Sequence, residues 1–177
     1  MALTLHETYV TAMIRYCEIL SDIIDKAIAY ADEKSMPPED LIEAQLISGM
    51  KGFGYQIQRV SDTCKGAMTR VGEGKVQPAS WPDDEKTFDE LKARLAKTVD
   101  YLKAVPEDAL EPKADEELVV KLGNGKTYSF TGKTYFMVYA MPNFYFHVVT
   151  AYDILRAKGV PIGKLDFLGG SRFPEAS

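Results

Sequence analysis

The segment from Met141 to Arg156, MPNFYFHVVTAYDILR, carries the strongest fold signal in the chain. It is apolar almost all the way round at helical spacing, which is typical of a helix surrounded by other helices. At about 100° per residue, Asn143, His147 and Thr150 fall on one stripe of this helix. Buried polar groups need partners or ligands, so the stripe indicates a candidate site in the interior of a helical protein.

A change of sequence period precedes this helix. Between Leu118 and Phe130 apolar residues alternate with polar ones, which is the pattern of β-strands. Gly123-Asn124-Gly125 interrupts the alternation with residues that suit a tight turn. The pattern predicts a small β-hairpin that covers one end of the helices, because two strands alone are only marginally stable. The Met141-Pro142 step then predicts a last helix that is either kinked or begins afresh there.

The amino-terminal part predicts a long amphipathic helix. Thr4 and Glu7 have the spacing of a capping box, so the helix is expected to begin near Leu5. Apolar residues then recur at helical spacing over several turns. Cys17 and Cys64 lie on apolar helical faces and show no metal-ligand spacing, so we expect two buried structural thiols.

A second helical region is predicted from Pro38, with a break near Ser48-Gly49 where glycines cluster. Beyond the break the apolar stripe places Gln56 on the inward side and Asp62 on the side that meets water.

A third helix is predicted between two loops. Asp83 or Asp84 is expected to cap it and Pro106 to end it, with Arg94 among the charges of its solvated face. Four amphipathic helices and one hairpin predict an all-α bundle with a small β insertion before the last helix.

Composition narrows the class of protein. The 177 residues are 46% hydrophobic and 27% charged, which is typical of one globular domain, predicted over residues 1–170 with a frayed tail at 171–177. The formal charge of −5 and the absence of a basic cluster argue against nucleic acid as a partner. No apolar run reaches the roughly 20 residues of a membrane span and no signal peptide is evident, which predicts a cytoplasmic protein without a membrane partner.

The block Pro142 to His147, together with Gly159-Val160-Pro161 and the segment Lys164 to Gly169, resembles the carboxy-terminal signature of a bacterial and fungal family of unknown function. That family lies in the DinB/YfiT-like superfamily of four-helix bundles, so the resemblance implies this fold and a homodimer. Further matching positions are Gln56, Asp62, Lys65, Phe88, Leu91, Arg94 and Phe130-Thr131-Gly132.

The superfamily resembles metal-dependent enzymes, in which three histidines bind a divalent metal such as zinc or nickel, and some relatives are thiol-dependent transferases or isomerases. The resemblance matches those ligands to Gln56, Asn143 and His147 of this chain. Two of the three are neutral amides, which zinc and nickel do not favour, so no metal site is predicted. His6 is expected near Lys158 if the first and last helices are antiparallel, roughly 16 Å from His147 and too far to complete a site.

Three functions remain open from the sequence. The first is a small-molecule-binding protein or vestigial enzyme, whose polar pocket contains Gln56, Asn143, His147 and Thr150 and in which His147 is the candidate catalytic acid or base. The second is an active divalent-metal-dependent hydrolase or thiol transferase. The third is a structural dimeric module in which the same side chains hydrogen-bond to one another and fix the register of the bundle.

Overall fold

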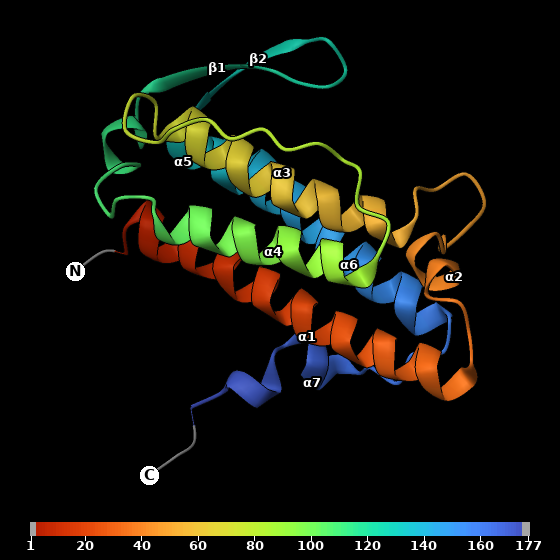
Figure 1. Cartoon of the computed structure of the whole chain (residues 1–177). Helices are drawn as coiled ribbons and strands as arrows, with labels where there is room; N and C mark the ends of the chain where they lie inside the picture. The colour runs from red at the N-terminus through yellow and green to blue at the C-terminus, as the bar shows by residue number, and fades with distance from the viewer. Residues whose placement is uncertain (1–2, 175–177) are drawn as a thin grey trace.

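The computed structural model describes residues 3–174 and shows a mostly helical chain with one small antiparallel sheet. Within that range four long helices lie side by side around one core (Figure 1). They are α1 (Thr11–Lys34), α3 (Phe53–Val71), α4 (Phe88–Lys103) and α6 (Met141–Ala157). The prediction of a helical fold with a small hairpin is therefore confirmed. No helix of the described residues has both the length and the apolarity needed to cross a membrane.

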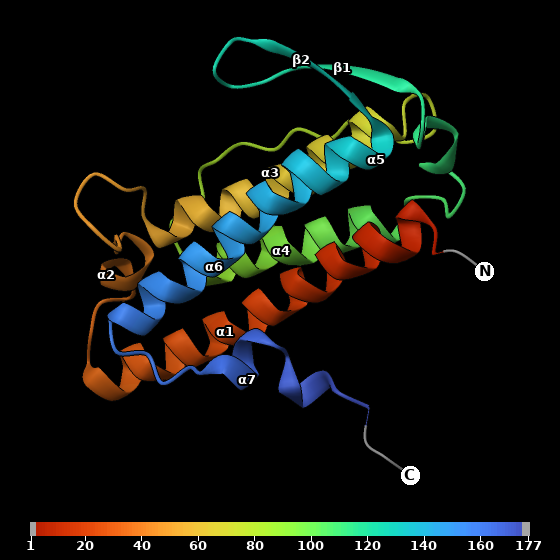
Figure 2. The same ribbon diagram turned by 180° about the vertical axis from the view of Figure 1, so that it is seen from behind.

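The four helices do not alternate in direction along the chain. Figures 1 and 2 show α1 and α6 running one way and α3 and α4 running the other. Tyr9 stacks on Phe136 with ring centroids 4.5 Å apart, and Tyr16 meets Tyr145 at 5.2 Å, as two parallel helices require. The antiparallel placement of His6 near Lys158 is therefore wrong.

The connection between α3 and α4 follows from these directions. Because the two helices are parallel, residues 72–87 must return along the length of the bundle, and Figure 1 shows this crossover segment passing beside α3. His6 lies just before the start of α1, and its Nε2 atom is 3.2 Å from the carbonyl oxygen of Val105, just beyond the last turn of α4.

The structure confirms the predicted start of the first helix and contradicts the predicted start of α4. The Thr4 backbone amide donates to Glu7 at 2.8 Å and the Glu7 amide to Thr4 Oγ1 at 3.0 Å, and a π-helical turn, η1 (His6–Val10), leads into α1. The break after the short α2 (Pro38–Ile42) is also confirmed. The predicted cap of α4 is wrong, because Thr87 forms a capping box with Glu90 while Asp83 is bound elsewhere.

The hairpin pairs β1 (Glu117–Lys121) with β2 (Thr127–Thr131), and only Gly125 of the turn has a positive φ, +79°. The short α5 (Gly132–Thr134) and the π-helix η3 (Tyr135–Ala140) then run into α6. Pro142 lies in the first turn of α6, and its missing N–H is accommodated by the wide turn before it. The segments η3 and α6 thus form one continuous helix, in which the pattern of backbone hydrogen bonds is irregular at Pro142.

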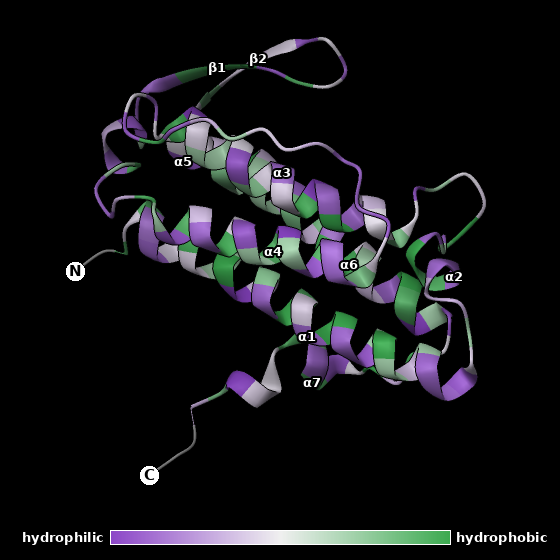
Figure 3. Cartoon of the chain, in the orientation of Figure 1, coloured by the Kyte–Doolittle hydropathy of each residue, from purple (hydrophilic) through white to green (hydrophobic). Residues whose placement is uncertain are grey.

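Burial follows the amphipathic pattern. Figure 3 shows hydrophobic and hydrophilic residues alternating round each long helix, and Phe144, Val148 and Ile154 of α6 are fully buried. Cys17 and Cys64 are buried free thiols, as predicted.

The carboxy-terminal segment packs along α1. It contains α7 (Lys164–Phe167) and a 3-10 turn, η4 (Gly170–Arg172). The Arg172 guanidinium forms two hydrogen bonds of 2.8 Å with Asp22. The tail predicted to fray from residue 171 is thus held at Arg172, whereas residues 175–177 lie outside the described residues.

Candidate functional site

An open cleft of about 360 Å³ lies between α3 and the continuous helix formed by η3 and α6. Asn143 and His147 are half-buried along it, so the polar stripe of α6 opens on a cleft rather than on a sealed interior. The lining residues are Tyr55, Arg59, Asp62, Thr63 and Arg70 of α3, Gly123 of the hairpin turn, Tyr135 and Tyr139 of η3, and Asn143 and His147 of α6.

His147 contacts Gln56 of α3, which does not itself line the cleft, with its Nδ1 atom 2.7 Å from Gln56 Oε1. Gln56 is 2% exposed, as the inward position predicts, and its Nε2 donates to the carbonyl oxygen of Lys51 at 2.9 Å. Because the Gln56 oxygen can only accept, Nδ1 of His147 carries the proton. The other ring nitrogen, Nε2, therefore carries a lone pair that can accept a hydrogen bond.

The ring is held in its neutral form. Burial, aided by the positive charge of Arg59, lowers the pKa of His147 from its ordinary value of 6.5 to about 4. The hydrogen-bond partner is a neutral amide, which does not favour the charged ring as a carboxylate would. At neutral pH the Nε2 atom can thus accept a hydrogen bond from a ligand, but it is a weak base.

Asn143 lies one turn before His147 and also reaches α3. Its Nδ2 donates to Thr63 Oγ1 at 2.8 Å, and that hydroxyl donates to the carbonyl oxygen of Arg59 at 2.7 Å. The Thr63 hydroxyl thus fixes the Asn143 amide, whose oxygen remains available as an acceptor beside the cleft.

Thr150 lies apart from these residues. Its side chain is buried and its hydroxyl donates to the carbonyl oxygen of Phe146 at 2.7 Å, within the same helix. A threonine hydroxyl is commonly satisfied in this way. The structure therefore brings together Gln56, Asn143 and His147, and Thr150 does not join them.

The donor set does not suit the metal that the superfamily resemblance implies. Zinc and nickel favour imidazole and thiolate, whereas this cluster offers one imidazole and two amides. The amide nitrogens of Gln56 and Asn143 already donate to Lys51 and Thr63. Among residues 3–174, no three histidine, cysteine, aspartate or glutamate side chains are grouped in a way that could hold a metal ion.

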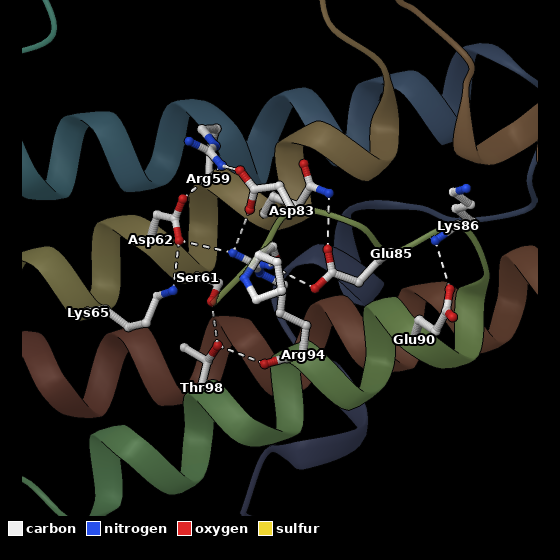
Figure 4. A network of polar contacts seen from close by, with 12 residues as sticks. Arg59, Ser61, Asp62, Lys65, Asp83, Glu85, Lys86, Glu90, Arg94 and Thr98 are labelled. Carbon is white, nitrogen blue, oxygen red and sulfur yellow. Dashed lines mark hydrogen bonds and ion pairs between the residues drawn. The ribbon is translucent and has the colours of Figure 1, made fainter. Parts of the chain in front are cut away.

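Sequence reasoning missed an ion network next to the cleft (Figure 4). Arg94 is 3% exposed rather than solvated, and its guanidinium binds Asp62 at 3.0 Å, Asp83 at 2.9 Å and Glu85 at 2.7 Å. Asp62 is half-buried rather than free in water. The available signal was the position of Arg94, three residues after Leu91 on the inward stripe.

Two further cations complete this network. Arg59 binds Asp62 at 2.7 Å and also pairs with Asp83, and Lys65 binds Asp62 at 2.8 Å. Burial alone would raise the pKa of Glu85, but the hydrogen bond from Arg94 holds that pKa below its ordinary value. Three carboxylates thus balance three cations, and the network joins the crossover segment to α3 and α4.

Trp81 belongs to the same crossover segment. The Nζ atoms of Lys65 and Lys97 lie 4.1 Å and 4.5 Å from the centre of its ring system. These cation–π contacts hold Trp81 against α3 and α4.

Comparison with known proteins agrees with the fold. A family model described as a domain of unknown function, DUF1993, matches residues 5–168. The crystal structure of a DinB family member protein from Shewanella denitrificans is similar over 97% of this chain and 96% of that chain, with a TM-score of 0.87 and 29% sequence identity. No curated protein matches this chain.

Proposed function

The chain belongs to the DUF1993 family, within the DinB-like superfamily, and from that premise we propose that it is a four-helix-bundle protein that binds a small molecule in the cleft between α3 and α6. Asn143 and His147 form the polar centre of the proposed pocket, and the buried Gln56 holds the His147 ring through its hydrogen bond. The protein is then a binding protein or a vestigial enzyme that lacks the three-histidine metal site of its superfamily.

The state of His147 is the observation that carries this proposal. Its Nδ1–H is committed to Gln56 Oε1, which leaves Nε2 as the neutral acceptor of a ring that lines the cleft. A general base works best when its pKa is near the operating pH, and a pKa of about 4 is well below it. The site therefore suits recognition of a ligand donor group better than proton abstraction.

Metal analysis separates this proposal from the metal-dependent hydrolase or thiol transferase. Protein purified without an affinity tag is incubated with zinc or nickel, desalted, and analysed by mass spectrometry for metal content. We expect well under one metal per chain, with no difference between wild type and His147→Ala. One tightly held metal per chain that disappears in His147→Ala refutes the proposal.

The two histidines of the chain allow a direct test of the proposed contact. In a ring-nitrogen NMR spectrum, His147 is expected as the neutral Nδ1–H tautomer at pH 7, and a ligand donor at Nε2 shifts its signals. His6, which contacts Val105 at the far end of α4, serves as the internal reference. A His147 ring that is protonated on Nε2, or that ignores every compound bound to the protein, contradicts the proposal.

We also propose a homodimer as the solution state. Val138, Phe146 and Val149 have exposed fractions of 67%, 56% and 40% and lie on one side of the η3–α6 helix. Exposed apolar residues in such a row are typical of an interface. Sedimentation analysis is expected to give a dimer for the wild type and a monomer for Phe146→Asp, and a monomeric wild type refutes this part of the proposal.

A further inference from the structure

The end of the cleft near the hairpin contains a cation that the ion network does not use. Arg70 lines the cleft together with Tyr135 and Tyr139. Its Nη1 atom is 3.4 Å from the hydroxyl of Tyr135, and within residues 3–174 no carboxylate pairs with it. The neighbouring Arg59, by contrast, is neutralised by Asp62 and Asp83. Of the two arginines that line the cleft, Arg70 is therefore the one whose positive charge has no carboxylate partner among the described residues.

Gly66 makes room for this guanidinium. A Cβ atom placed on Gly66 would clash with Arg70 Nη1 and lie 3.5 Å from Arg70 Cζ. The Arg70 side chain thus folds back against the preceding turn of α3 at the edge of the cleft, where the residue remains exposed to solvent. Glycine is less favourable than alanine inside a helix, so Gly66 accommodates the Arg70 side chain at some expense of helix stability.

The wall opposite Arg70 is aromatic. The rings of Tyr135 and Tyr139 have centroids 5.6 Å apart, and Phe130 of β2 lies 5.7 Å from Tyr135 and 6.4 Å from Tyr139. Burial raises the pKa of Tyr135, so its hydroxyl remains a donor at neutral pH. The Arg70 guanidinium, the Tyr135 hydroxyl and the ring of Tyr139 thus lie together at this end of the cleft, with Phe130 packed against the two tyrosine rings.

We infer that the cleft takes a small organic carboxylate with a flat apolar body, whose carboxylate pairs with Arg70 and whose body lies along Tyr139 toward His147. A carboxylate matches the planar fork of a single guanidinium through two parallel hydrogen bonds. A phosphate dianion would leave charge unpaired at a site with one free cation. This inference rests on the proposed function and names the ligand class for the same pocket.

The probe for the test is 3-phenylpropionate, with 3-phenylpropionamide as the matched neutral compound. Binding to isotope-labelled wild-type protein is followed by NMR titration, and we expect 3-phenylpropionate to bind in the millimolar range, at least about tenfold more tightly than the amide. Inorganic phosphate is expected to compete weakly. No binding of 3-phenylpropionate up to about 10 mM, equal binding of the amide, or phosphate binding as tightly as 3-phenylpropionate overturns the inference.

Two variants test the role of Arg70, and one serves as a control. Arg70→Gln removes the charge, and Gly66→Ala keeps the charge but displaces the guanidinium without disturbing backbone, so each is expected to weaken 3-phenylpropionate binding about tenfold or more. Arg156→Gln makes the same charge change at an exposed position of α6 outside the cleft lining and should leave binding unchanged. Binding unaffected by Arg70→Gln, or weakened equally by Arg156→Gln, refutes the inference.

The same titration distinguishes the inference from the function on which it rests. If the probe shifts the His147 ring and still binds Arg70→Gln, the pocket stands and the carboxylate assignment is wrong. If binding requires Arg70 but is unchanged in His147→Gln, the carboxylate site stands and the pocket centred on His147 is wrong.

Discussion

The stability of the protein in mild acid should depend on one ring. The pKa of His147 is about 4 in the folded chain against an ordinary value of 6.5, because of burial and the charge of Arg59. The unfolded chain thus takes up a proton near pH 6.5, whereas the folded chain resists it until near pH 4. The stability that comes from the neutral ring is complete above pH 6.5 and is lost as the pH falls from 6.5 to 4.

The size of this loss follows from the change in pKa. At about 1.4 kcal/mol for each pKa unit, the change from 6.5 to about 4 corresponds to a ceiling of roughly 3 kcal/mol. The His147 ring is only partly buried, and solvent screening reduces the ceiling to roughly 1–2 kcal/mol. Replacing His147 with glutamine removes the proton uptake from both states.

Chemical unfolding of wild type and His147→Gln between pH 7.5 and pH 4.5 measures the effect. Carboxylates that titrate in this range are common to both proteins and cancel in the difference. We expect the free-energy advantage of the wild type to shrink by roughly 1–2 kcal/mol across the range. An advantage that stays constant, or a His147 ring that is half-protonated at pH 6 or above by NMR, would refute the reasoning.

Gln56→Glu provides the matched variant. It places a carboxylate at the oxygen that now accepts from Nδ1, and an opposite charge at hydrogen-bond distance favours the charged imidazole. The pKa of His147 should therefore rise, and the NMR midpoint should move to a higher pH. An unchanged midpoint would show that Gln56 does not contact the ring in solution.

Three further predictions concern the fold. Arg94→Met should lower the free energy of unfolding by about 3 kcal/mol, because it leaves the part-buried Glu85 without a cation and removes one of the cations that Asp62 and Asp83 share. Lys103→Ala at an exposed position of the same helix should change it by no more than about 0.5 kcal/mol in the same urea titration. Thr87→Ala should cost about 1 kcal/mol through loss of the α4 cap, measured by thermal unfolding; a cost equal to zero would place the helix start elsewhere. Arg172→Ala should speed amide hydrogen exchange in residues 168–173 but not in α6, and unchanged exchange would mean that Asp22 does not hold the tail.

Periodicity predicts the parts of the fold that depend on local sequence. The hairpin follows from alternation on either side of Gly123-Asn124-Gly125, and the break before α3 follows from clustered glycines. The inward direction of Gln56 also follows from its apolar neighbours one turn away. These features depend on contacts within a few turns, so the sequence pattern contains them.

Periodicity does not predict the hydrogen-bond and ion-pair partners of Arg94, Asp62 and Thr150. Arg94 is buried because the crossover segment brings Asp83 and Glu85 over it, and the path of that segment depends on the parallel arrangement of α3 and α4. Periodicity shows which face of a helix is buried, but it does not show in which direction neighbouring helices run. The expected position of His6 near Lys158 is wrong for the same reason, because α1 and α6 are parallel. Thr150 was placed correctly on a buried face, but its own helix satisfies the hydroxyl.

The π-helix η3 sets the line of the cleft. Tyr135, Tyr139, Asn143 and His147 recur every four residues and all reach the same cleft. In a regular α-helix such a series winds round the axis by about 40° at each step, so its two ends would diverge by about 120°. The wider turns of η3 carry more residues per revolution and rotate the series the other way. The wide turns of η3 thereby offset the rotation of the α-helical part and keep Tyr135 and Tyr139 on the same side of the helix as Asn143 and His147. Deleting one residue from η3 would turn the two tyrosines away from that side.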